Sequence, residues 1–240
     1  MASPEPRVAE TSWHSLPAAD VLSRLAADPR GLPAAEAQRR RTRYGANRLP
    51  EPPRRSALMR LLSQCNNVLI WVLLAASVIT ALLGEWTDTA VIIGVVAVNA
   101  AIGFVQEGKA ERALEAISGL LSPRALVLRD GHREEILAEN LVPGDLVVLQ
   151  AGDLVPADLR ITSRRNLQVD EAILTGESVA VEKSVLPVAE AASLGDRLSM
   201  AWSGTLVTAG TGVGVVVATG ADTQIGRISA MLSRVQTLST

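Results

Sequence analysis

The stretch that decides the fold runs from Asn66 to Gly84 and reads NNVLIWVLLAASVITALLG. It contains no charged residue, and a helix needs about 20 residues to cross a bilayer core of ~30 Å. A second apolar run follows from Trp86 to Phe104, with Asp88 near its start. Because only Glu85 separates the two runs, we expect a tight antiparallel hairpin of two transmembrane helices over residues 66–105.

The charges on either side of the hairpin predict how it is inserted. Basic residues precede the first run, at Arg54, Arg55 and Arg60, and follow the second, at Lys109 and Arg112. The turn between the runs has neither Lys nor Arg. Positive charge favours the cytoplasmic side, so both termini are expected there, in an integral protein of the cell membrane. The alternative, a buried hairpin in a soluble protein, needs more surrounding chain than 240 residues provide.

Composition excludes several other classes of protein. The formal charge of −2 gives no reason to expect a nucleic-acid partner. A single cysteine, Cys65, excludes an intrachain disulfide, and the two histidines, His14 and His132, lie too far apart in sequence to suggest a metal site. The first ten residues, MASPEPRVAE, lack the pattern of a signal peptide, so membrane targeting is expected to come from further along the chain.

Residues 1–65 are predicted to form a cytoplasmic helical cap and a stiff linker. One helix is expected over about Ala18–Ala27 after Pro17, and another over about Ala34–Tyr44 after Pro33. Gly45 suits the position that ends a helix. Three prolines then interrupt the chain, at positions 50, 52 and 53.

Residues 106–235 are predicted to form a mostly antiparallel β-domain with flanking helices, which makes the chain an α+β membrane protein. A polar helix over Gln106–Leu121 continues the second span, and a helix over about Gln224–Val235 precedes a linker, 236–240, to a third membrane helix that the chain lacks. Asp130-Gly131 suits the turn of a β-hairpin. The expected strands are Ala125–Arg129, Glu135–Leu137, Leu146–Gln150, Leu159–Ser163, Thr205–Thr208 and Val213–Thr219.

One loop of this domain carries a candidate for chemistry. Residues 170–183 read DEAILTGESVAVEK, in which Thr175-Gly176-Glu177-Ser178 presents a carboxylate beside a glycine and two hydroxyls. A carboxylate held in this way can orient and deprotonate a water molecule, as hydrolysis of an acyl phosphate requires. Taken alone, the four residues are as readily explained by a solvated Glu in a surface turn.

Other glycines and carboxylates are interpreted as structural. Turn residues of the β-domain are expected to cap or hydrogen-bond the backbone, namely Gly144, Asp145, Gly152, Asp153 and Pro156. The run Gly210-x-Gly212-x-Gly214 is followed by a strand pattern at 215–217 rather than by a helix. We therefore reject a nucleotide-binding interpretation of this run.

Taken together, the motifs resemble the P-type ATPases, and in particular their type II cation pumps, from about residue 12 to the end. The resemblance is carried by short segments in the family's order and spacing. They are Trp13-His14-Ser15-Leu16, Tyr44-Gly45-Ala46-Asn47-Arg48-Leu49, Asn99 to Glu107, Val142-Pro143-Gly144-Asp145, Gly152 to Asp158, Thr175-Gly176-Glu177-Ser178, Glu182-Lys183, Ser203-Gly204-Thr205 and Thr219-Gly220.

The resemblance implies that residues 106–235 are an actuator domain. In such pumps ATP, with Mg²⁺, phosphorylates an aspartate in a separate domain, and the actuator loop then promotes loss of that phosphate. Glu177 would position the attacking water, and Thr175, Gly176 and Ser178 would shape the loop. Rotation of the domain would pull the hairpin. The implied partners are the bilayer, the phosphorylation and nucleotide-binding domains, and the transported cation.

The chain has no Asp-Lys-Thr-Gly-Thr segment and no nucleotide-binding domain, so it is expected to bind no cofactor and to be inactive alone. Three hypotheses stay open at this point. The chain is part of a full-length pump, or a membrane-anchored regulatory or binding module that acts on another pump, or a small hydrolase that uses Glu177 directly. The third hypothesis is the weakest, because the sequence shows no nucleophile, metal site or partner base for such a hydrolase. The sequence also does not indicate which cation is transported.

Overall fold

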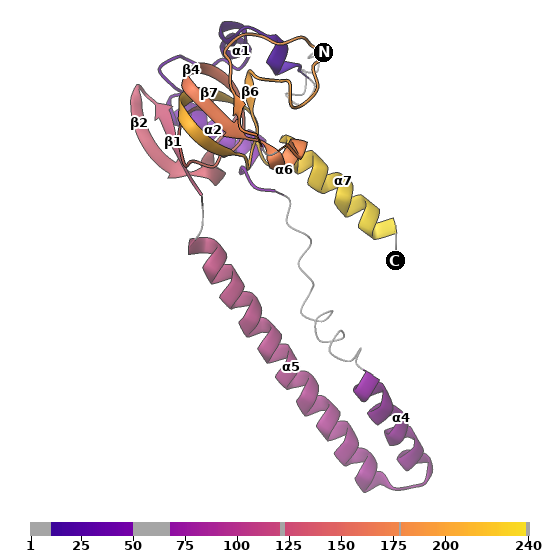
Figure 1. The fold of residues 1–240 in the computed structure, drawn as a ribbon. Coiled ribbons are helices and arrows are strands. Elements are labelled where there is room, and N and C mark those ends of the chain that lie inside the picture. The colour runs from indigo at the N-terminus through magenta and orange to yellow at the C-terminus, as the bar shows by residue number, and fades with distance from the viewer. Residues whose placement is uncertain (1–10, 50–67, 121–122, 178, 239–240) are drawn as a thin grey trace, which may run out of the picture. The chain divides into compact units, whose positions relative to one another are not determined.

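The computed structural model describes residues 11–49, 68–120, 123–177 and 179–238. These residues form two compact units, shown in Figure 1. One unit is the helical hairpin. The other combines the N-terminal residues 11–49 with the β-sheet and the helix after it, and we call it the β-domain. The N-terminal helices are therefore packed with the sheet, although some 70 residues of hairpin and linker separate them in sequence.

The hairpin consists of helices α4 (Val68–Leu82) and α5 (Trp86–Leu120). Gly84 has a φ of +82° between them, which reverses the chain without steric penalty. The Thr80 and Thr89 hydroxyls join the two helices by a hydrogen bond of 2.8 Å. Helix α5 continues through the second apolar run to Leu120, which confirms the prediction that a helix from Gln106 extends the second span. The start of the first apolar run, Asn66 and Asn67, lies outside the described residues.

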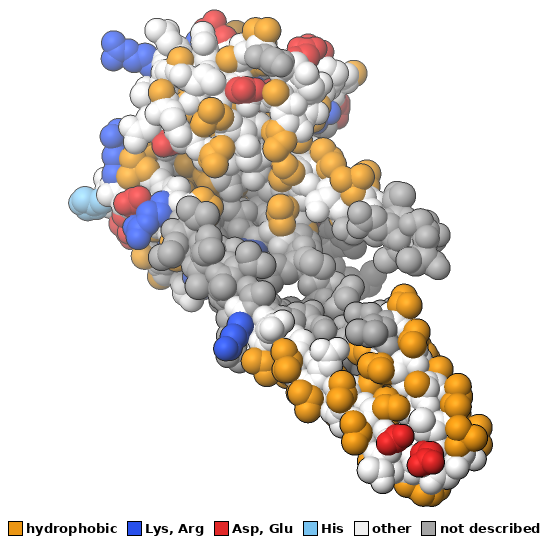
Figure 2. Space-filling model, turned by 60° about the horizontal axis from the view of Figure 1, so that its bottom comes forward, with side chains coloured by type: hydrophobic (Ala, Val, Ile, Leu, Met, Phe, Trp, Pro, Cys, Tyr) orange, Lys and Arg blue, Asp and Glu red, His pale blue; other side chains and the backbone are white. Residues whose placement is uncertain are grey.

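Many of the described side chains between Val68 and Val105 are hydrophobic and exposed. Figure 2 shows hydrophobic side chains along both helices and acidic side chains at the turn end. The stretch 86–106 of α5 is long and apolar enough to cross a membrane, with a mean hydropathy of 2.0. Only 11% of it is buried within the protein. Helix α4 contains a shorter apolar stretch, Ile70–Leu82.

The N-terminal residues form a 3₁₀ turn, η2 (Trp13–Ser15), and helices α1 (Ala18–Arg24) and α2 (Ala34–Tyr44). Helix α2 has the predicted bounds, and Gly45 ends it with a φ of +82°. Helix α1 is three residues shorter than predicted. It stops early because Ala26 adopts a φ of +45° and the Ala27 N–H returns to the Leu22 carbonyl at 2.9 Å, which closes the helix end.

The β-domain is built on one antiparallel sheet in the order β2-β1-β3-β7-β4-β5, with β6 paired to β4. Asp130 and Gly131 turn the chain between β1 and β2 with φ values of +48° and +78°, which confirms the predicted hairpin. The strands are β1 (Arg124–Arg129), β2 (His132–Leu137), β3 (Leu146–Gln150), β4 (Asp158–Asp170), β5 (Val181–Glu182), β6 (Met200–Ala201) and β7 (Leu206–Ala218).

Four of the strand predictions are wrong in extent, and the smallest difference is that β2 begins at His132 rather than at Glu135. β7 is one strand, although two were predicted with a break at Gly210, and its partner β4 continues well past Ser163. Gly210 lies within β7 with a φ of +75°, and a Cβ there would lie 2.1 Å from the Asn166 carbonyl oxygen. It faces a register shift between Arg165 and Gln168 in the neighbouring strand β4, where the two backbones come very close. Glycine permits this close approach within the strand, so its presence here does not mark a turn.

Two clusters of buried side chains pack against this sheet. One joins the N-terminal residues Trp13, Val21 and Leu25 to the sheet. The other is made of aliphatic side chains from β1, β3, β4 and β7, including Val127, Leu149, Leu159, Ile161, Leu167, Val169, Val207 and Val216. The glycine-rich run is part of the same packing, because a Cβ on Gly212 would lie 2.7 Å from Leu167 Cδ2. The short elements η3 (Ala138–Asn140), α6 (Ala172–Thr175) and η4 (Gly220–Asp222) were not predicted, and α7 (Gln224–Leu238) extends slightly beyond its predicted end.

Candidate functional site

The candidate loop leaves the sheet at the end of β4 and returns in β5. Pairing of Val169 with Val181 and of Gln168 with Glu182 holds its two ends side by side. Immediately after β4 the chain makes the short helix α6, whose first N–H, on Ala172, donates to Asp170 Oδ1 at 2.9 Å. Of the predicted site residues, Thr175 ends this helix, and Gly176 and Glu177 follow it directly.

Thr175, Gly176 and Glu177 are held in a defined backbone conformation. The Thr175 hydroxyl donates to the Glu171 carbonyl at 3.1 Å and accepts the Glu177 N–H at 3.3 Å. Gly176 adopts a left-handed φ of +77° that ends the helix, and a side chain there would be strained although no atom lies within 4 Å. Ser178, the fourth predicted residue, lies outside the described residues.

The loop therefore turns the Glu177 carboxylate outward on a fixed backbone. Its side chain is exposed. A carboxylate in this position can contact a partner surface and accept a proton from a water molecule there.

An ion pair that sequence reasoning did not single out closes the base of the loop. Lys183 Nζ lies 2.5 Å from Glu171 Oε1, and both side chains are fully buried. Burial raises the pKa of the Glu171 carboxyl and lowers the pKa of the Lys183 ammonium, while each partner opposes the shift of the other. Both residues occur in the quoted segment 170–183, but nothing local in the sequence indicates that their charges are removed from water.

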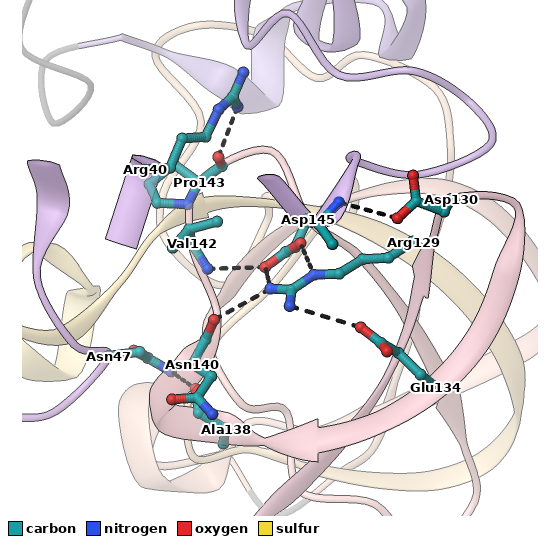
Figure 3. Close-up of polar contacts among 11 residues, drawn as sticks. Arg40, Asn47, Arg129, Asp130, Glu134, Ala138, Asn140, Val142, Pro143 and Asp145 are labelled. Atoms are coloured by element: carbon teal, nitrogen blue, oxygen red, sulfur yellow. Dashed lines mark hydrogen bonds and ion pairs between the residues drawn. The ribbon is translucent and has the colours of Figure 1, made fainter. Parts of the chain in front are cut away.

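The turn residues interpreted as structural have that role. The Asp145 carboxylate accepts the Val142 N–H at 2.9 Å and forms a two-point ion pair with Arg129 (Figure 3). Asp153 accepts the Gln150 N–H at 2.9 Å. Gly144 has a φ of +98°, and a Cβ there would lie 2.1 Å from the Arg40 guanidinium.

Polar contacts fasten the N-terminal helices to the sheet (Figure 3). The Asp130 carboxylate accepts the first N–H of α2, on Ala34, at 3.0 Å and so caps this helix from the β1–β2 turn. Arg40 donates to the Pro143 carbonyl at 2.8 Å. The Asn47 amide donates to the Ala138 and Pro156 carbonyls at 3.0 and 2.8 Å and accepts the Gly220 N–H at 2.8 Å. Asn47 thus joins the end of the N-terminal segment to the start of η4.

Two family models match the chain. One, of the P-type ATPase actuator domain, matches residues 119–233, and the other, of the cation transporter/ATPase N-terminus, matches residues 13–80. Together they cover the N-terminal helices, most of the first apolar run and most of the β-domain with its loop.

Curated proteins resemble the chain along nearly its whole length. It is 48% identical over 97% of its residues to a probable cation-transporting ATPase F of Mycobacterium tuberculosis, of which it covers 26%. It is 44% identical to calcium-transporting ATPase 1 of Bacillus cereus, over 92% of the chain and 26% of the relative. It is 44% identical to the cation-transporting ATPase pma1 of Synechocystis, over 98% of the chain and 26% of the relative. The chain therefore spans about a quarter of the length of these proteins.

Proposed function

The chain belongs to the P-type cation-transporting ATPases, of which it forms the N-terminal and actuator portion, and we propose that it serves ATP-driven cation transport by promoting the breakdown of an aspartyl phosphate. The phosphorylated aspartate, ATP and Mg²⁺ belong in this proposal to phosphorylation and nucleotide-binding domains outside these 240 residues. The later membrane helices would select the cation.

The observation that carries the proposal is the exposed Glu177 on a backbone fixed by Thr175 and Gly176. When the loop meets the phosphorylated aspartate, the Glu177 carboxylate orients a water molecule and takes a proton from it. The water oxygen forms a bond to phosphorus, and the bond between phosphorus and the aspartyl oxygen breaks. Inorganic phosphate leaves, and the aspartate is restored. Thr175 and Gly176 contribute by fixing the direction of the backbone that carries the carboxylate.

We also propose that residues 66–105 cross the cell membrane as a helical hairpin with both ends in the cytoplasm. The hydropathy of α5, the outward-facing apolar side chains and the basic residues at both ends support this. The segments 1–65 and 106–235 would then lie together in the cytoplasm, and 236–240 would lead towards a third membrane helix. Movement of the actuator domain would be passed to the hairpin as a rigid-body displacement.

The first experiment measures the size of the native protein in membrane extracts with an antibody against residues 125–220. A band several times larger than 25.3 kDa supports the proposal, because the phosphorylated domain must then be in the same polypeptide. A band of 25.3 kDa would favour a membrane-anchored module that acts on another pump.

The decisive experiment follows the acid-stable phosphoenzyme of the pump that contains this chain. Glu177→Gln should let the phosphoenzyme form from ATP and slow its decay by at least about tenfold, because the loss of a general base costs 10² to 10⁴ in rate. Glu182→Gln, an exposed carboxylate at the end of the same loop, is the matched control. Equal decay rates in the two variants would remove Glu177 from the mechanism.

A further inference from the structure

The two ends of the candidate loop are tied together inside the β-domain. Glu171 lies directly before α6, and Lys183 follows β5. Their side chains meet at 2.5 Å with no exposed surface on either. The Lys183 backbone is fixed as well, because its N–H donates to the Leu167 carbonyl in β4 at 2.9 Å. The loop thus starts and ends at two buried, oppositely charged groups in contact.

A continuous series of contacts runs from this ion pair to Glu177. The Glu171 carbonyl accepts both the N–H and the hydroxyl of Thr175, at 3.0 and 3.1 Å. The Thr175 hydroxyl in turn accepts the Glu177 N–H at 3.3 Å. A displacement of Glu171 would therefore be passed through Thr175 to the backbone that carries the Glu177 carboxylate.

A contribution to folding stability does not by itself explain why Glu171 and Lys183 form a buried ion pair. The removal of two charges from water costs more than their attraction commonly returns, and apolar residues of similar volume are often at least as stabilising. Apart from the ion pair, neither side chain has a hydrogen-bond partner among the described residues. A short contact between two buried charges does, however, fix the separation and direction of the two chain segments that carry them.

We propose that Glu171 and Lys183 are positioning residues, whose ion pair fixes the base of the loop and so, through Thr175, the direction in which Glu177 meets the phosphorylated aspartate. This inference rests on the proposed function of Glu177. A second ion pair at the same loop base provides the matched control, because Arg164 Nη1 lies 2.5 Å from Glu182 Oε1 but the Glu182 side chain is 60% exposed.

The test compares phosphoenzyme decay in four variants of the pump that contains this chain: Glu177→Gln, Lys183→Met, the double variant Glu171→Leu with Lys183→Met, and Arg164→Met. We expect phosphoenzyme to form in all of them. Decay should slow at least about tenfold in Lys183→Met and in the double variant, since even small misplacement of a catalytic group is costly. Arg164→Met should decay at the rate of the unaltered pump.

The double variant separates positioning from stability. It leaves no unpaired buried charge, so it should fold even if Lys183→Met does not, and slow decay in a folded double variant supports the inference. Decay at the unaltered rate in the double variant would overturn it. If Glu177→Gln slows decay and the Lys183 variants do not, this inference fails and the proposed function stands.

A second readout does not depend on catalysis. In the 240-residue chain held in detergent, amide hydrogen exchange at 172–177 should be faster in the double variant than in the unaltered chain, while exchange in β3 and β7 stays the same. Unchanged exchange in the loop would overturn the inference. If Glu177→Gln does not slow phosphoenzyme decay, the proposed function fails, and the exchange experiment still decides whether the ion pair orders the loop.

Discussion

The Asp158 carboxylate, at the start of β4, accepts the backbone N–H of Gln224, the first residue of α7, at 2.8 Å. Its other oxygen accepts the Ser203 N–H at 2.9 Å. One buried side chain therefore both caps α7 and holds the turn before β7. Burial raises the pKa of this carboxyl to about 6 from its ordinary value of 3.8, and the two N–H donors only partly oppose that shift.

This raised pKa predicts a pH dependence of stability. Between pH 3.8 and about 6 the folded chain binds the Asp158 proton more tightly than the unfolded chain does. The contribution of Asp158 to the free energy of unfolding is therefore largest below pH 3.8 and falls as the pH rises through about 6, by roughly 3 kcal/mol in total. Urea unfolding of the β-domain at several pH values, in the 240-residue chain held in detergent, measures this change in the unfolding free energy.

Other carboxyls also titrate in this range, so the comparison is with Asp158→Asn, which cannot ionise. The difference in unfolding free energy, unaltered chain minus Asp158→Asn, should fall by roughly 3 kcal/mol between pH 3.5 and pH 7. A difference that stays constant over this range would show that Asp158 ionises in the folded chain as readily as in the unfolded one.

The hydrogen bonds of the Thr175 hydroxyl predict that two conservative substitutions at this position have different effects on phosphoenzyme decay. Thr175→Val keeps the shape of the side chain but removes both the bond to the Glu171 carbonyl and the acceptor for the Glu177 N–H. Phosphoenzyme decay should slow in this variant by roughly tenfold, and each lost hydrogen bond should cost about 1 kcal/mol of stability. Thr175→Ser keeps the hydroxyl and should decay at nearly the unaltered rate. Decay at the unaltered rate in Thr175→Val would show that the two hydrogen bonds of the hydroxyl do not set the position of Glu177.

Local patterns in the sequence predicted the elements whose causes are local. Asp130-Gly131 forms the turn of a hairpin because both residues can adopt positive φ. Helix α2 begins after Pro33, which restricts the backbone, and ends at Gly45, which can adopt a positive φ. The order of the motifs also located the loop around Glu177. These features depend on residues a few positions apart, which a single sequence displays.

Features that depend on distant partners were missed. The sequence predicts that a strand ends at Gly210, whereas this glycine lies within β7 and allows the backbone at Asn166, in the neighbouring strand, to come close. The charges of Glu171 and Lys183 would ordinarily be assigned to solvent, and only the fold brings them into contact. The N-terminal helices were assigned to a separate cap, because the residues that hold them follow the hairpin in sequence.

The contacts of Asn47 predict that replacing its amide by a carboxylate strongly destabilises the β-domain. Its NH₂ group donates to the Ala138 and Pro156 carbonyls. Asn47→Asp keeps the size of the side chain but places a carboxylate oxygen against these two carbonyl oxygens, so we expect a loss of roughly 2–4 kcal/mol in the unfolding free energy at pH 7. Urea unfolding measures it, with the exposed Asn166→Asp as control. Equal losses in the two variants would contradict the role of Asn47.

Arg160, in β4, donates hydrogen bonds to five backbone carbonyls from different parts of the β-domain. Its buried guanidinium donates to Trp13 and Leu16 in the N-terminal segment, to Val185 after the functional loop, and to Ile161 and Ser199. Burial lowers the pKa of Arg160 to about 10, so the side chain remains charged at neutral pH. Arg160 thus joins the N-terminal segment to the chain that leaves the loop, through hydrogen bonds to carbonyl oxygens.

Arg160→Lys tests whether the planar guanidinium is what binds the N-terminal segment. A lysine keeps the charge but has three donors at a single point, and it cannot reach five carbonyls that lie in different directions. We expect a loss of roughly 3 kcal/mol in stability and faster hydrogen exchange at 13–16 than in the rest of the β-domain. Arg165→Lys, at an exposed position of the same strand, is the control and should change neither. If exchange at 13–16 is unaltered in Arg160→Lys, charge alone holds the segment, and the number and direction of the donors are irrelevant.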